Sequence, residues 1–394
     1  MRTVGIIAEY NPLHNGHLCH LREARRLSGA DLVVVVMSTA FTQRGEPALF
    51  SMDDRVRMAL AAGADAVFAL PALWAVRDAE HFALGGVSLL QRLGCDAISF
   101  GAECTDPGLL AETAALLESD SPGLRTALQP YLAQGLPWPQ AISRAAEELL
   151  PGAGALLASP NNTLGICYLR AMLRLDAPMA PVVVRRQGSY HSGELAEGAL
   201  PSATAVRAAL RSGQTERALE AVPACCRPIL QSGRQAAPDG LDQALLYRLR
   251  SMTEAEYAAL PGLSEGIENR LRQAAERAVN REELLALADT RRYPAARLSR
   301  LCAHALLRLE ESALRDAPLP ELWLLGMRPT AAPLLKQVQE KGTRVLSRSG
   351  EMDPNALWVK TELLAHSLWC LAAGCPAESL LQRKFIYFSS SSSA

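Results

Sequence analysis

The chain has 394 residues, of which 49% are hydrophobic, 21% charged and 5% aromatic, and its formal net charge is -1 at pH 7. These values are typical of a compact folded protein and exclude a disordered or fibrous chain, and the length predicts more than one domain. The net charge neither favours nor excludes a nucleic-acid partner, because a basic stripe can be hidden inside a balanced total.

The first hundred residues contain a repeated unit after an initial apolar segment, TVGIIAEY at residues 3–10. In each unit an amphipathic segment ends at a glycine, an aspartate follows two residues later, and an apolar run then begins. The predicted helices span residues 16–28, 51–62 and 80–93, and the apolar runs span residues 32–37, 66–71 and 97–101. Glycine is the residue preferred where a helix ends.

Apolar strands that alternate with helices predict β-α-β units, in which helices cover both faces of a parallel sheet. The expected fold class is therefore α/β, with a Rossmann-like doubly wound parallel sheet. Ligands of such sheets bind beyond the carboxyl ends of the strands. The candidate loops after the four strands are residues 9–17, 37–50, 70–81 and 100–103.

Residues 105–155 are predicted to be helical, with proline and glycine interruptions, as an insertion into this pattern. After them, PNN at residues 160–162 precedes an amphipathic helix, and PVVVRR at residues 181–186 is typical of a short strand. SATAVRAALRSG at residues 202–213 begins with a helix-capping serine. This return to strand, loop and helix predicts that the first domain spans residues 1–212.

Residues 213–394 are predicted to form a second, mainly helical region with a disordered Ser-rich tail. Arginines recur along its helices with acidic residues between them, which is typical of a solvated helix face. The alternative is a surface that contacts the phosphates of a nucleic acid. These arginines are Arg248, Arg250, Arg270, Arg272, Arg277, Arg281, Arg291, Arg292, Arg297 and Arg300.

No apolar run reaches the roughly 18 residues that a membrane helix needs. The first residues lack the charged, apolar and cleavage regions of a signal peptide. The nine cysteines form no CxxC pair and no zinc-type spacing with histidine. We therefore expect a cytoplasmic protein with reduced thiols.

The stretch AEYNPLHNGHLCHL at residues 8–21 places His14 and His17 around Gly16, directly after the first strand. If a helix begins there, both histidines lie at its first turn, where unpaired backbone N–H groups and the helix dipole favour an anion. Gly16 has no Cβ and would let a phosphate approach the backbone. Imidazole N–H groups could then stabilise the charge that develops on a triphosphate during nucleotidyl transfer.

A metal site and a chance occurrence account less well for the histidine pair. A spacing of three residues without an adjacent third ligand is poor for zinc, so we expect no metal site formed by the protein. Chance fits poorly because the chain has only seven histidines. Whether Mg²⁺ accompanies the nucleotide stays open.

The strand followed by NPLHNGH resembles the HxGH signature of the nucleotidyltransferase superfamily. The resemblance is narrower to the bacterial tRNA(Met) cytidine acetate ligase family, whose motifs occur here in the same order. They are EYNPLHNGHLCHL, FTQRGEPA, ADAVFALP, FGAE, SPNNTLGICYL, RRQGSYH and SATAVR. The resemblance covers residues 1–212 strongly and the remainder by general layout. Two departures are Leu13, where an aromatic residue is usual, and Thr39-Ala40, where a Gly-Asn type pair is usual.

The resemblance implies an enzyme that activates acetate with ATP as acetyl-adenylate and transfers the acetyl group to N4 of the wobble cytidine of elongator tRNA(Met), forming N4-acetylcytidine. It implies that His14 and His17 are catalytic, at the ATP phosphates. The helical region is then a candidate for the tRNA-binding region. The resemblance also implies an ATP site made of Ile7, Ala8, Glu9, Tyr10, Asn11, Pro12, Leu13, His14, Asn15, Gly16, His17, Leu18, Cys19, His20, Gly101, Asn162, Arg185, Arg186, Ser202, Thr204 and Arg207.

Several of these implied contacts have a physical rationale. Gly101 at a strand end would let the nucleoside lie against the backbone. The Asn162 amide offers a donor and an acceptor to a base edge, and Arg185 and Arg186 could hold a phosphate through paired N–H groups. His20 has a weaker case than His14 or His17 for contacting phosphate.

Other polar residues keep alternative roles. Ser202 either joins Thr204 and Arg207 in a second phosphate site or only caps a helix. His81 is expected to be structural, and His191 has no assigned role. The segment FTQRGEPA carries three polar side chains, Gln43, Arg44 and Glu46. They order a lid, contact the tRNA or form a plain salt-bridged loop.

Two further functions stay open. One is an adenylyltransferase that makes a small nucleotide cofactor, although such enzymes are usually compact single domains. The other is a non-catalytic RNA-binding protein that kept the fold, which would not need both histidines. A class I aminoacyl-tRNA synthetase fits less well because the chain has no KMSKS-like segment.

Overall fold

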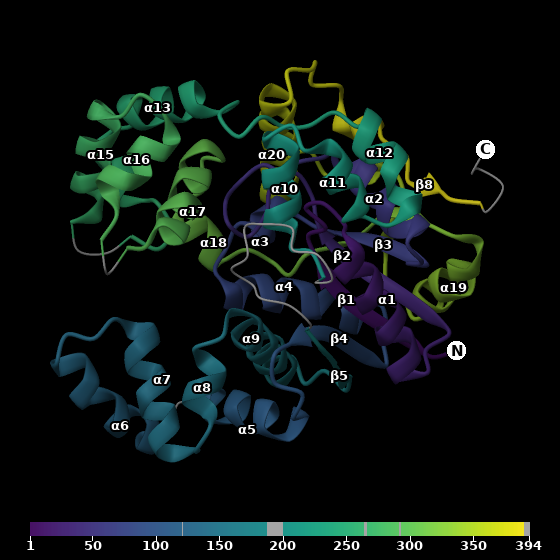
Figure 1. Ribbon diagram of the computed structural model, residues 1–394, viewed down its shortest axis with the longest axis horizontal. Coiled ribbons are helices and arrows are strands. Elements are labelled where there is room, and N and C mark those ends of the chain that lie inside the picture. The colour runs from purple at the N-terminus through teal and green to yellow at the C-terminus, as the bar shows by residue number, and fades with distance from the viewer. Residues whose placement is uncertain (120, 187–199, 264–265, 291–292, 390–394) are drawn as a thin grey trace.

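The computed structural model describes residues 1–119, 121–186, 200–263, 266–290 and 293–389. A central sheet has helices on both faces, and two helical lobes extend from the same side of it (Figure 1). The strand order is β5-β4-β1-β2-β3-β6-β7, with β8 paired to β6. The strands are β1 (Thr3–Ala8), β2 (Leu32–Ser38), β3 (Ala66–Leu70), β4 (Ala97–Ala102), β5 (Ala180–Arg185), β6 (Leu322–Met327), β7 (Val345–Leu346) and β8 (Ile386–Tyr387).

The first five strands are parallel and confirm the predicted doubly wound sheet. The chain moves from β1 to β2 and β3, then crosses back to β4 and β5 on the other side of β1. Because such crossovers are right-handed, the helices before and after this reversal cover opposite faces. The helices that cover the two faces are α1 (Asn15–Ser28), α2 (Met52–Ala61), α4 (Ala79–Arg92) and α9 (Pro160–Arg174).

The repeated glycine and aspartate turns have two functions. The glycines at residues 29, 63 and 94 have φ angles of 61°, 114° and 72°, as expected where helices end. The aspartates each accept a backbone N–H at the start of a neighbouring strand. These bonds join Arg2 N–H to Asp31 (2.7 Å), Val33 N–H to Asp65 (2.8 Å) and Thr3 N–H to Asp96 (2.7 Å). The repeated turn therefore also aligns adjacent strands.

The C-terminal region is mainly helical, as expected, but it also adds strands to the central sheet. Residues 322–327 form β6, which is fully buried and pairs antiparallel with β3. The edge of β3 would otherwise leave its backbone groups unpaired, and β6 covers it. One hydrophobic core includes residues from both β1 and β6, so the boundary expected at residue 212 runs through a continuous core.

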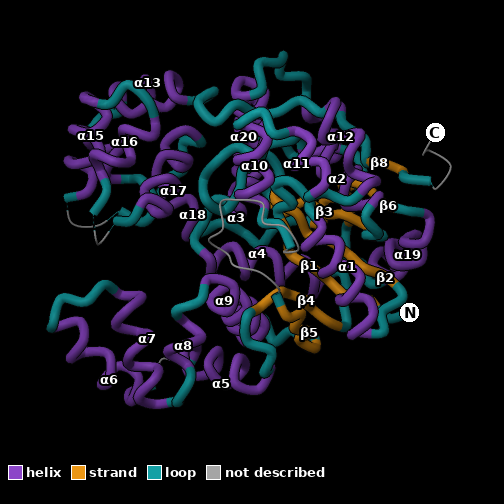
Figure 2. The backbone as a smooth tube through the Cα atoms, viewed as in Figure 1, coloured by secondary structure: helices purple, strands orange, loops and turns teal. Residues whose placement is uncertain are grey.

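Two helical lobes lie beside the sheet (Figure 2). The predicted helical insertion is confirmed as α5 (Pro107–Glu118), α6 (Pro122–Ala133), α7 (Trp138–Leu149) and α8 (Ala153–Leu157). The second lobe has its own apolar core and contains α13 (Asp242–Ser251), α14 (Glu254–Ala258), α15 (Ile267–Arg277), α16 (Arg281–Ala288) and α17 (Ala295–Leu306). The remaining helices are α3 (Ala72–Ala75), α10 (Ala203–Arg211), α11 (Thr215–Glu220), α12 (Arg227–Ser232), α18 (Glu311–Arg315), α19 (Ala332–Glu340) and α20 (Leu357–Ala372).

A buried arginine joins the carboxyl ends of the two central strands. Arg55 of α2 is completely buried, and its guanidinium donates to the carbonyls of Glu9 (2.8 Å) and Ser38 (2.9 Å), and also to that of Thr39. Glu362 of α20 is buried nearby and accepts the backbone N–H of Ala72 at 2.7 Å. The last long helix therefore supports the same strand ends that carry the predicted site.

None of the helices in the described ranges is long and apolar enough to cross a membrane. All nine cysteines are free thiols.

Candidate active site

A cavity of about 580 Å³ lies beyond the carboxyl ends of β1 and β4, where a doubly wound sheet binds its ligands. Its size is that of a typical small-molecule site. The cavity walls come from the β1–α1 turn, residues 42–46, α4, α9 and α10, together with Ala296 of α17. The cavity thus lies between the sheet ends, the helices around them and the edge of the second helical lobe.

His14 and His17 form the N-terminal cap of α1. The Nδ1 atom of His14 accepts the backbone N–H of Gly16 at 3.1 Å, and the Nδ1 atom of His17 accepts that of His14 at 3.3 Å. This reciprocal arrangement is a capping box built from two imidazoles. The two rings stack with centroids 3.8 Å apart, and both line the cavity.

The cap determines which ring nitrogen of each histidine carries its proton. A neutral imidazole whose Nδ1 accepts a hydrogen bond has its hydrogen on Nε2. Burial lowers the pKa of His14 to about 3, with the Arg186 and Arg207 guanidiniums acting in the same direction. Burial also holds the pKa of His17 well below its usual value. Both rings are therefore neutral near pH 7 and present an Nε2–H donor.

The expectation of unpaired backbone N–H groups at this helix start is wrong. The amide of Asn15 donates to the Ala221 carbonyl at 2.9 Å, that of Gly16 donates to the His14 ring, and that of His17 donates to the His14 carbonyl at 2.8 Å. A Cβ on Gly16 would lie 2.9 Å from the His14 ring. Gly16 is therefore needed because the His14 ring folds over it, and the donors left for an anion are imidazole groups.

The SATAVR segment lies beside the histidines, as expected. Arg207 donates from Nη1 to the Asn11 carbonyl at 2.6 Å and from Nη2 to the Thr204 hydroxyl at 3.3 Å. Ser202 caps α10 by accepting the N–H of Ala205 at 3.0 Å. Because Ser202, Thr204 and Arg207 also line the cavity, the capping role of Ser202 and its place at the candidate site are compatible.

Asn162 is placed differently from the expectation. It is buried, and its Oδ1 accepts the backbone N–H groups of Glu103 and Cys104, both at 3.0 Å. The neighbouring Asn161 lines the cavity instead, and its Oδ1 accepts from Arg186 at 2.9 Å. The helical rotation of about 100° per residue separates these two adjacent side chains, and the sequence motif alone did not distinguish them.

The remaining predicted site residues divide into three groups. Ile7, Ala8, Glu9, Tyr10, Asn11, His20, Gly101 and Arg186 line the cavity. Gly16, Cys19 and Arg185 line an adjacent smaller hollow, and Pro12, Leu13, Asn15 and Leu18 line neither. The side chain of Leu13 is fully buried, and His20 is held by the Ser99 hydroxyl at 3.0 Å.

The FTQRGEPA loop is anchored to the second helical lobe. Glu46 forms an ion pair with Arg281 at 3.2 Å, and the Ser299 hydroxyl donates to the Arg44 carbonyl at 2.5 Å. Gln43, Arg44 and Glu46 all line the cavity. Of the alternatives for this loop, the structure supports a salt-bridged segment, and it is one that joins the cavity to α17.

Gly45 allows the FTQRGEPA loop to pack against α17. Gly45 has a φ of 76°, and a Cβ there would lie 2.6 Å from the Ser299 carbonyl oxygen. We expect Gly45→Ala to lower the free energy of unfolding by about 3 kcal/mol, as the sum of a left-handed backbone and a steric clash. Urea denaturation measures this change.

The matched control is Gly213→Ala. Gly213 has a φ of 74°, but a Cβ there would meet no atom within 4 Å. Only the backbone cost of about 1 kcal/mol should appear. Equal losses in the two variants would mean that the loop does not pack tightly on the second lobe.

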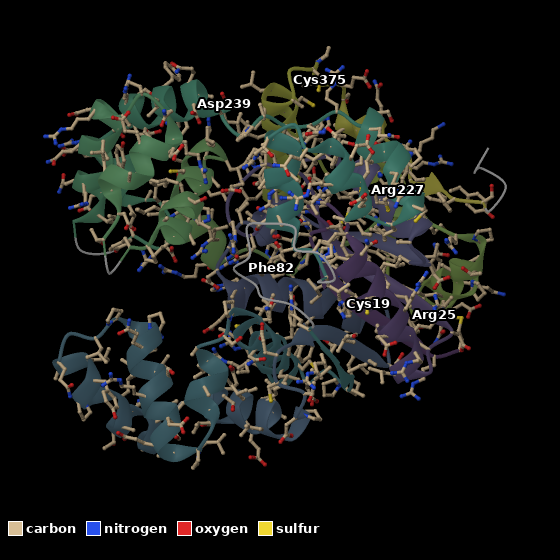
Figure 3. The ribbon with its side chains drawn as sticks, in the orientation of Figure 1. Cys19, Arg25, Phe82, Arg227, Asp239 and Cys375 are labelled. Atoms are coloured by element: carbon tan, nitrogen blue, oxygen red, sulfur yellow. The ribbon has the colours of Figure 1, made fainter. Side chains whose placement is uncertain are left out.

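Some cavity residues carry no motif in the sequence. One of them is Phe82 on α4, which lies near the centre of the molecule (Figure 3). It is an apolar wall residue of an ordinary amphipathic helix, so only its place in the fold distinguishes it. His191 and the arginines at residues 291 and 292 lie outside the described residues.

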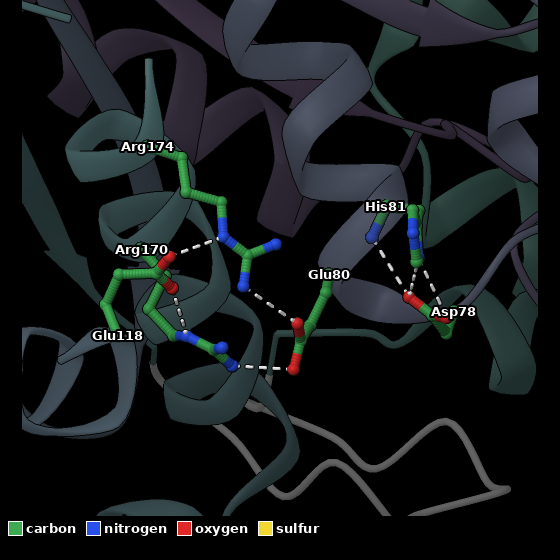
Figure 4. Close-up of polar contacts among 6 residues, drawn as sticks. All are labelled: Asp78, Glu80, His81, Glu118, Arg170 and Arg174. Carbon is green, nitrogen blue, oxygen red and sulfur yellow. Dashed lines mark hydrogen bonds and ion pairs between the residues drawn. The ribbon is translucent and has the colours of Figure 1, made fainter. Parts of the chain in front are cut away.

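His81 is structural, as expected. Its ring contacts the carboxylate of Asp78, the N-cap residue of α4, at 2.9 Å (Figure 4). The same end of α4 carries Glu80, which with Glu118 of α5 holds two arginines of α9. Arg170 donates to Glu80 at 2.6 Å and to Glu118 at 3.0 Å, and Arg174 donates to Glu118 at 2.6 Å. This network fixes the insertion lobe to the helices behind the cavity.

The comparisons with known proteins agree with these features. A family model described as HIGH Nucleotidyl Transferase matches residues 1–381. A tRNA(Met) cytidine acetate ligase of Geobacillus sp. (strain WCH70) is 35% identical over 349 residues, which are 86% of this chain and 87% of that protein. The protein of the same name from Bacillus subtilis (strain 168) is 36% identical over 340 residues, with 83% and 82% covered.

Two solved structures share the fold. Thermotoga maritima TmcAL without ligand has a TM-score of 0.90 and 24% identity, and the match covers 98% of this chain and 99% of that one. The same protein bound with alpha-thio ATP has a TM-score of 0.86 and 24% identity, with 98% and 100% covered. These matches confirm the expected α/β fold.

Proposed function

The chain belongs to the tRNA(Met) cytidine acetate ligase family of HIGH nucleotidyl transferases, and we propose that it acetylates N4 of the wobble cytidine of elongator tRNA(Met), using acetate and ATP. The product is N4-acetylcytidine. The location follows from the substrate and is the cytoplasm.

The geometry of the histidine pair is the main support for this proposal. Two neutral imidazoles, His14 and His17, are held by their Nδ1 atoms in a helix cap and present Nε2–H groups to the cavity. Neutral donors fixed by the fold can follow the charge that develops on a phosphate without first losing water. Arg186 and Arg207 supply positive charge on the same cavity wall.

The reaction proceeds in two steps at this site. In the first, an acetate oxygen attacks the α-phosphorus of ATP, pyrophosphate leaves, and acetyl-adenylate forms. The imidazole N–H groups and Arg207 stabilise the phosphate charge during this attack. In the second, the N4 amine of cytidine attacks the acetyl carbonyl and AMP leaves. Mg²⁺ would accompany the triphosphate as its counter-ion and neutralise part of its charge.

Ala296 of α17 is part of the cavity wall, and we infer that the tRNA approaches the cavity beside this helix. Arg300 lies on the same helix, is partly exposed and carries its charge close to Asp78. An arginine at this position can contact the phosphates around the wobble base.

Isotope exchange tests the first step. The protein is incubated with ATP, labelled pyrophosphate and formate, acetate, propionate or no carboxylate, with and without EDTA. We expect label to enter ATP only with acetate, and only without EDTA. In a second assay, labelled acetate should enter tRNA(Met) and not a tRNA(Met) transcript whose wobble cytidine is replaced by uridine.

Two other results would favour other functions. Pyrophosphate exchange that is independent of carboxylate would favour an adenylyltransferase that makes a small nucleotide cofactor. The absence of any turnover would favour a non-catalytic RNA-binding protein.

A further inference from the structure

Glu9 is an unexpected residue for the wall of a triphosphate site. It directly follows β1, and its side chain lines the same cavity as His14 and His17. A carboxylate repels phosphate oxygens, and this repulsion is stronger where water is partly excluded. A role in holding ATP therefore does not explain why an acidic side chain occupies this position.

The carboxylate of Glu9 is held firmly on one side only. Its Oε1 accepts the backbone N–H of Gln43 at 2.6 Å. Arg55 is close, but its guanidinium donates to the backbone carbonyl of Glu9. Among the described residues, Glu9 forms no ion pair within 4.0 Å. Its Oε2 atom is also not one of the fully buried side-chain atoms that lack a hydrogen-bond partner. One carboxylate oxygen is thus oriented by the loop and the other is available to a ligand in the cavity.

Glu9 lies close to a proposed phosphate-binding arginine and to the loop that joins the cavity to the second lobe. Burial raises the pKa of Glu9, while the Gln43 N–H and the Arg55, Arg207 and Arg44 guanidiniums act in the opposite direction. Gln43 and Arg44 belong to the loop that is anchored on α17, the helix beside which the tRNA base would arrive. Tyr168 of α9 is also close, since burial first and the charge of Glu9 second raise the pKa of its phenol. The carboxylate is therefore within reach of the charge of Arg207 on one side and of the loop beside the second lobe on the other.

We propose that Glu9 is a catalytic residue for the transfer step, where it accepts a hydrogen bond from the cytidine N4 amine and removes its proton. This inference rests on the proposed function. Acidic side chains are the natural acceptors for the N4 amino group of cytosine. As the N4–carbonyl bond forms, the bond between the acetyl carbon and the AMP oxygen breaks. AMP leaves with the electron pair, and the N4 proton moves to Oε2 of Glu9 and then to water.

The chemistry of the acceptor makes such a base useful. The lone pair of the N4 amine is delocalised into the cytosine ring, so the amine becomes a competent nucleophile only as it loses a proton. Burial raises the pKa of Glu9 above its ordinary value, and this makes the carboxylate a stronger base than one in water. The Gln43 N–H keeps Oε1 occupied and leaves Oε2 to take the proton.

The test measures adenylation and acetyl transfer separately in the Glu9→Gln variant. The side-chain oxygen of the new glutamine can still accept the Gln43 N–H. Enzyme loaded with ATP and labelled acetate is mixed with tRNA(Met), and the single-turnover rate of acetyl transfer is followed from pH 5 to 9. We expect the rate to fall about 100-fold, at the lower end of what general-base catalysis contributes. Acetate-dependent pyrophosphate exchange and the KM for tRNA should change less than threefold. The acid limb of the wild-type pH profile should disappear, because the carboxylate must be ionised to accept the proton.

Two further variants complete the test. Glu9→Asp keeps a carboxylate and should retain an acid limb, which a purely structural role would not require. Glu23→Gln makes the same change on the exposed surface of α1 and should leave both half-reactions unaltered. An unchanged transfer rate in Glu9→Gln, or an equal loss of exchange and transfer, would overturn the role of Glu9. If the wild-type protein showed no acetate-dependent pyrophosphate exchange, the proposed function itself would fail. This measurement uses only the wild-type protein, so it is distinct from the test of Glu9.

Discussion

Replacing His17 by alanine is expected to lower acetate-dependent pyrophosphate exchange by about 10²–10³-fold, which is the typical cost of one fixed donor to a developing charge. The same loss is expected for His14→Ala. Both changes remove an Nε2–H donor, whereas Arg186 and Arg207 remain in the cavity wall to hold the triphosphate. ATP should therefore still bind measurably, and calorimetry with ATP in the absence of acetate checks this.

His14 also caps α1, and a suitable variant can separate this capping role from its role as a donor to phosphate. Its Nδ1 caps α1, so His14→Ala also removes a cap worth about 1 kcal/mol. Asparagine is a good capping residue but cannot supply the imidazole Nε2–H. We expect His14→Asn to keep the unfolding free energy of the wild type and to exchange pyrophosphate as slowly as His14→Ala.

The matched control for this series is His366→Gln. His366 lies on α20, and its ring contacts the Glu378 carbonyl at 3.1 Å. It does not line the cavity, so the exchange rate should be that of the wild type. Normal exchange in both His14→Asn and His17→Ala would contradict the phosphate-contact role of the pair.

The second large effect is expected on stability. Arg55→Met should lower the free energy of unfolding by about 3–5 kcal/mol, the usual cost of removing one member of a buried charged group. The change leaves the carbonyls of Glu9, Ser38 and Thr39 without their side-chain donor. It also removes the positive charge that offsets buried Glu362, whose pKa burial already raises to about 7. Urea denaturation at pH 7 and 25 °C measures the difference.

Arg57→Met is the control on the same helix. Arg57 is half exposed and contacts Asp54 at 3.7 Å, a surface pair of little energetic value. Its replacement should change stability by less than about 0.5 kcal/mol. A loss in Arg55→Met that is no larger than in Arg57→Met would show that the strand ends do not depend on the buried guanidinium.

Much of the sheet was predictable because its signals are local. Each glycine that ends a helix and each apolar run that follows it lie within a few residues of one another, so the order of strand and helix is visible in the chain. The HNGH segment likewise indicated a helix start close to the histidine pair, and α1 begins at Asn15. What it did not reveal is that the two histidines cap this helix themselves and thereby occupy its first amides.

The antiparallel edge strand was not predictable in the same way. Residues 322–327 are apolar, but they follow a long helical region and form only a short run. Their pairing with β3 joins residues more than 250 positions apart in sequence, for example Ala66 with Met327. No local pattern announces a partner at that separation.

The sequence by itself determined the parallel β-α-β arrangement, the helix start at the histidine pair and the family motifs, since each depends on neighbouring residues. Only the tertiary structure decided that Asn161, and not Asn162, lines the cavity. It also decided that the FTQRGEPA loop is held by Arg281 and Ser299, and that one oxygen of Glu9 remains available. These features depend on side-chain direction and on contacts between distant segments, which packing of the whole chain sets and local sequence does not.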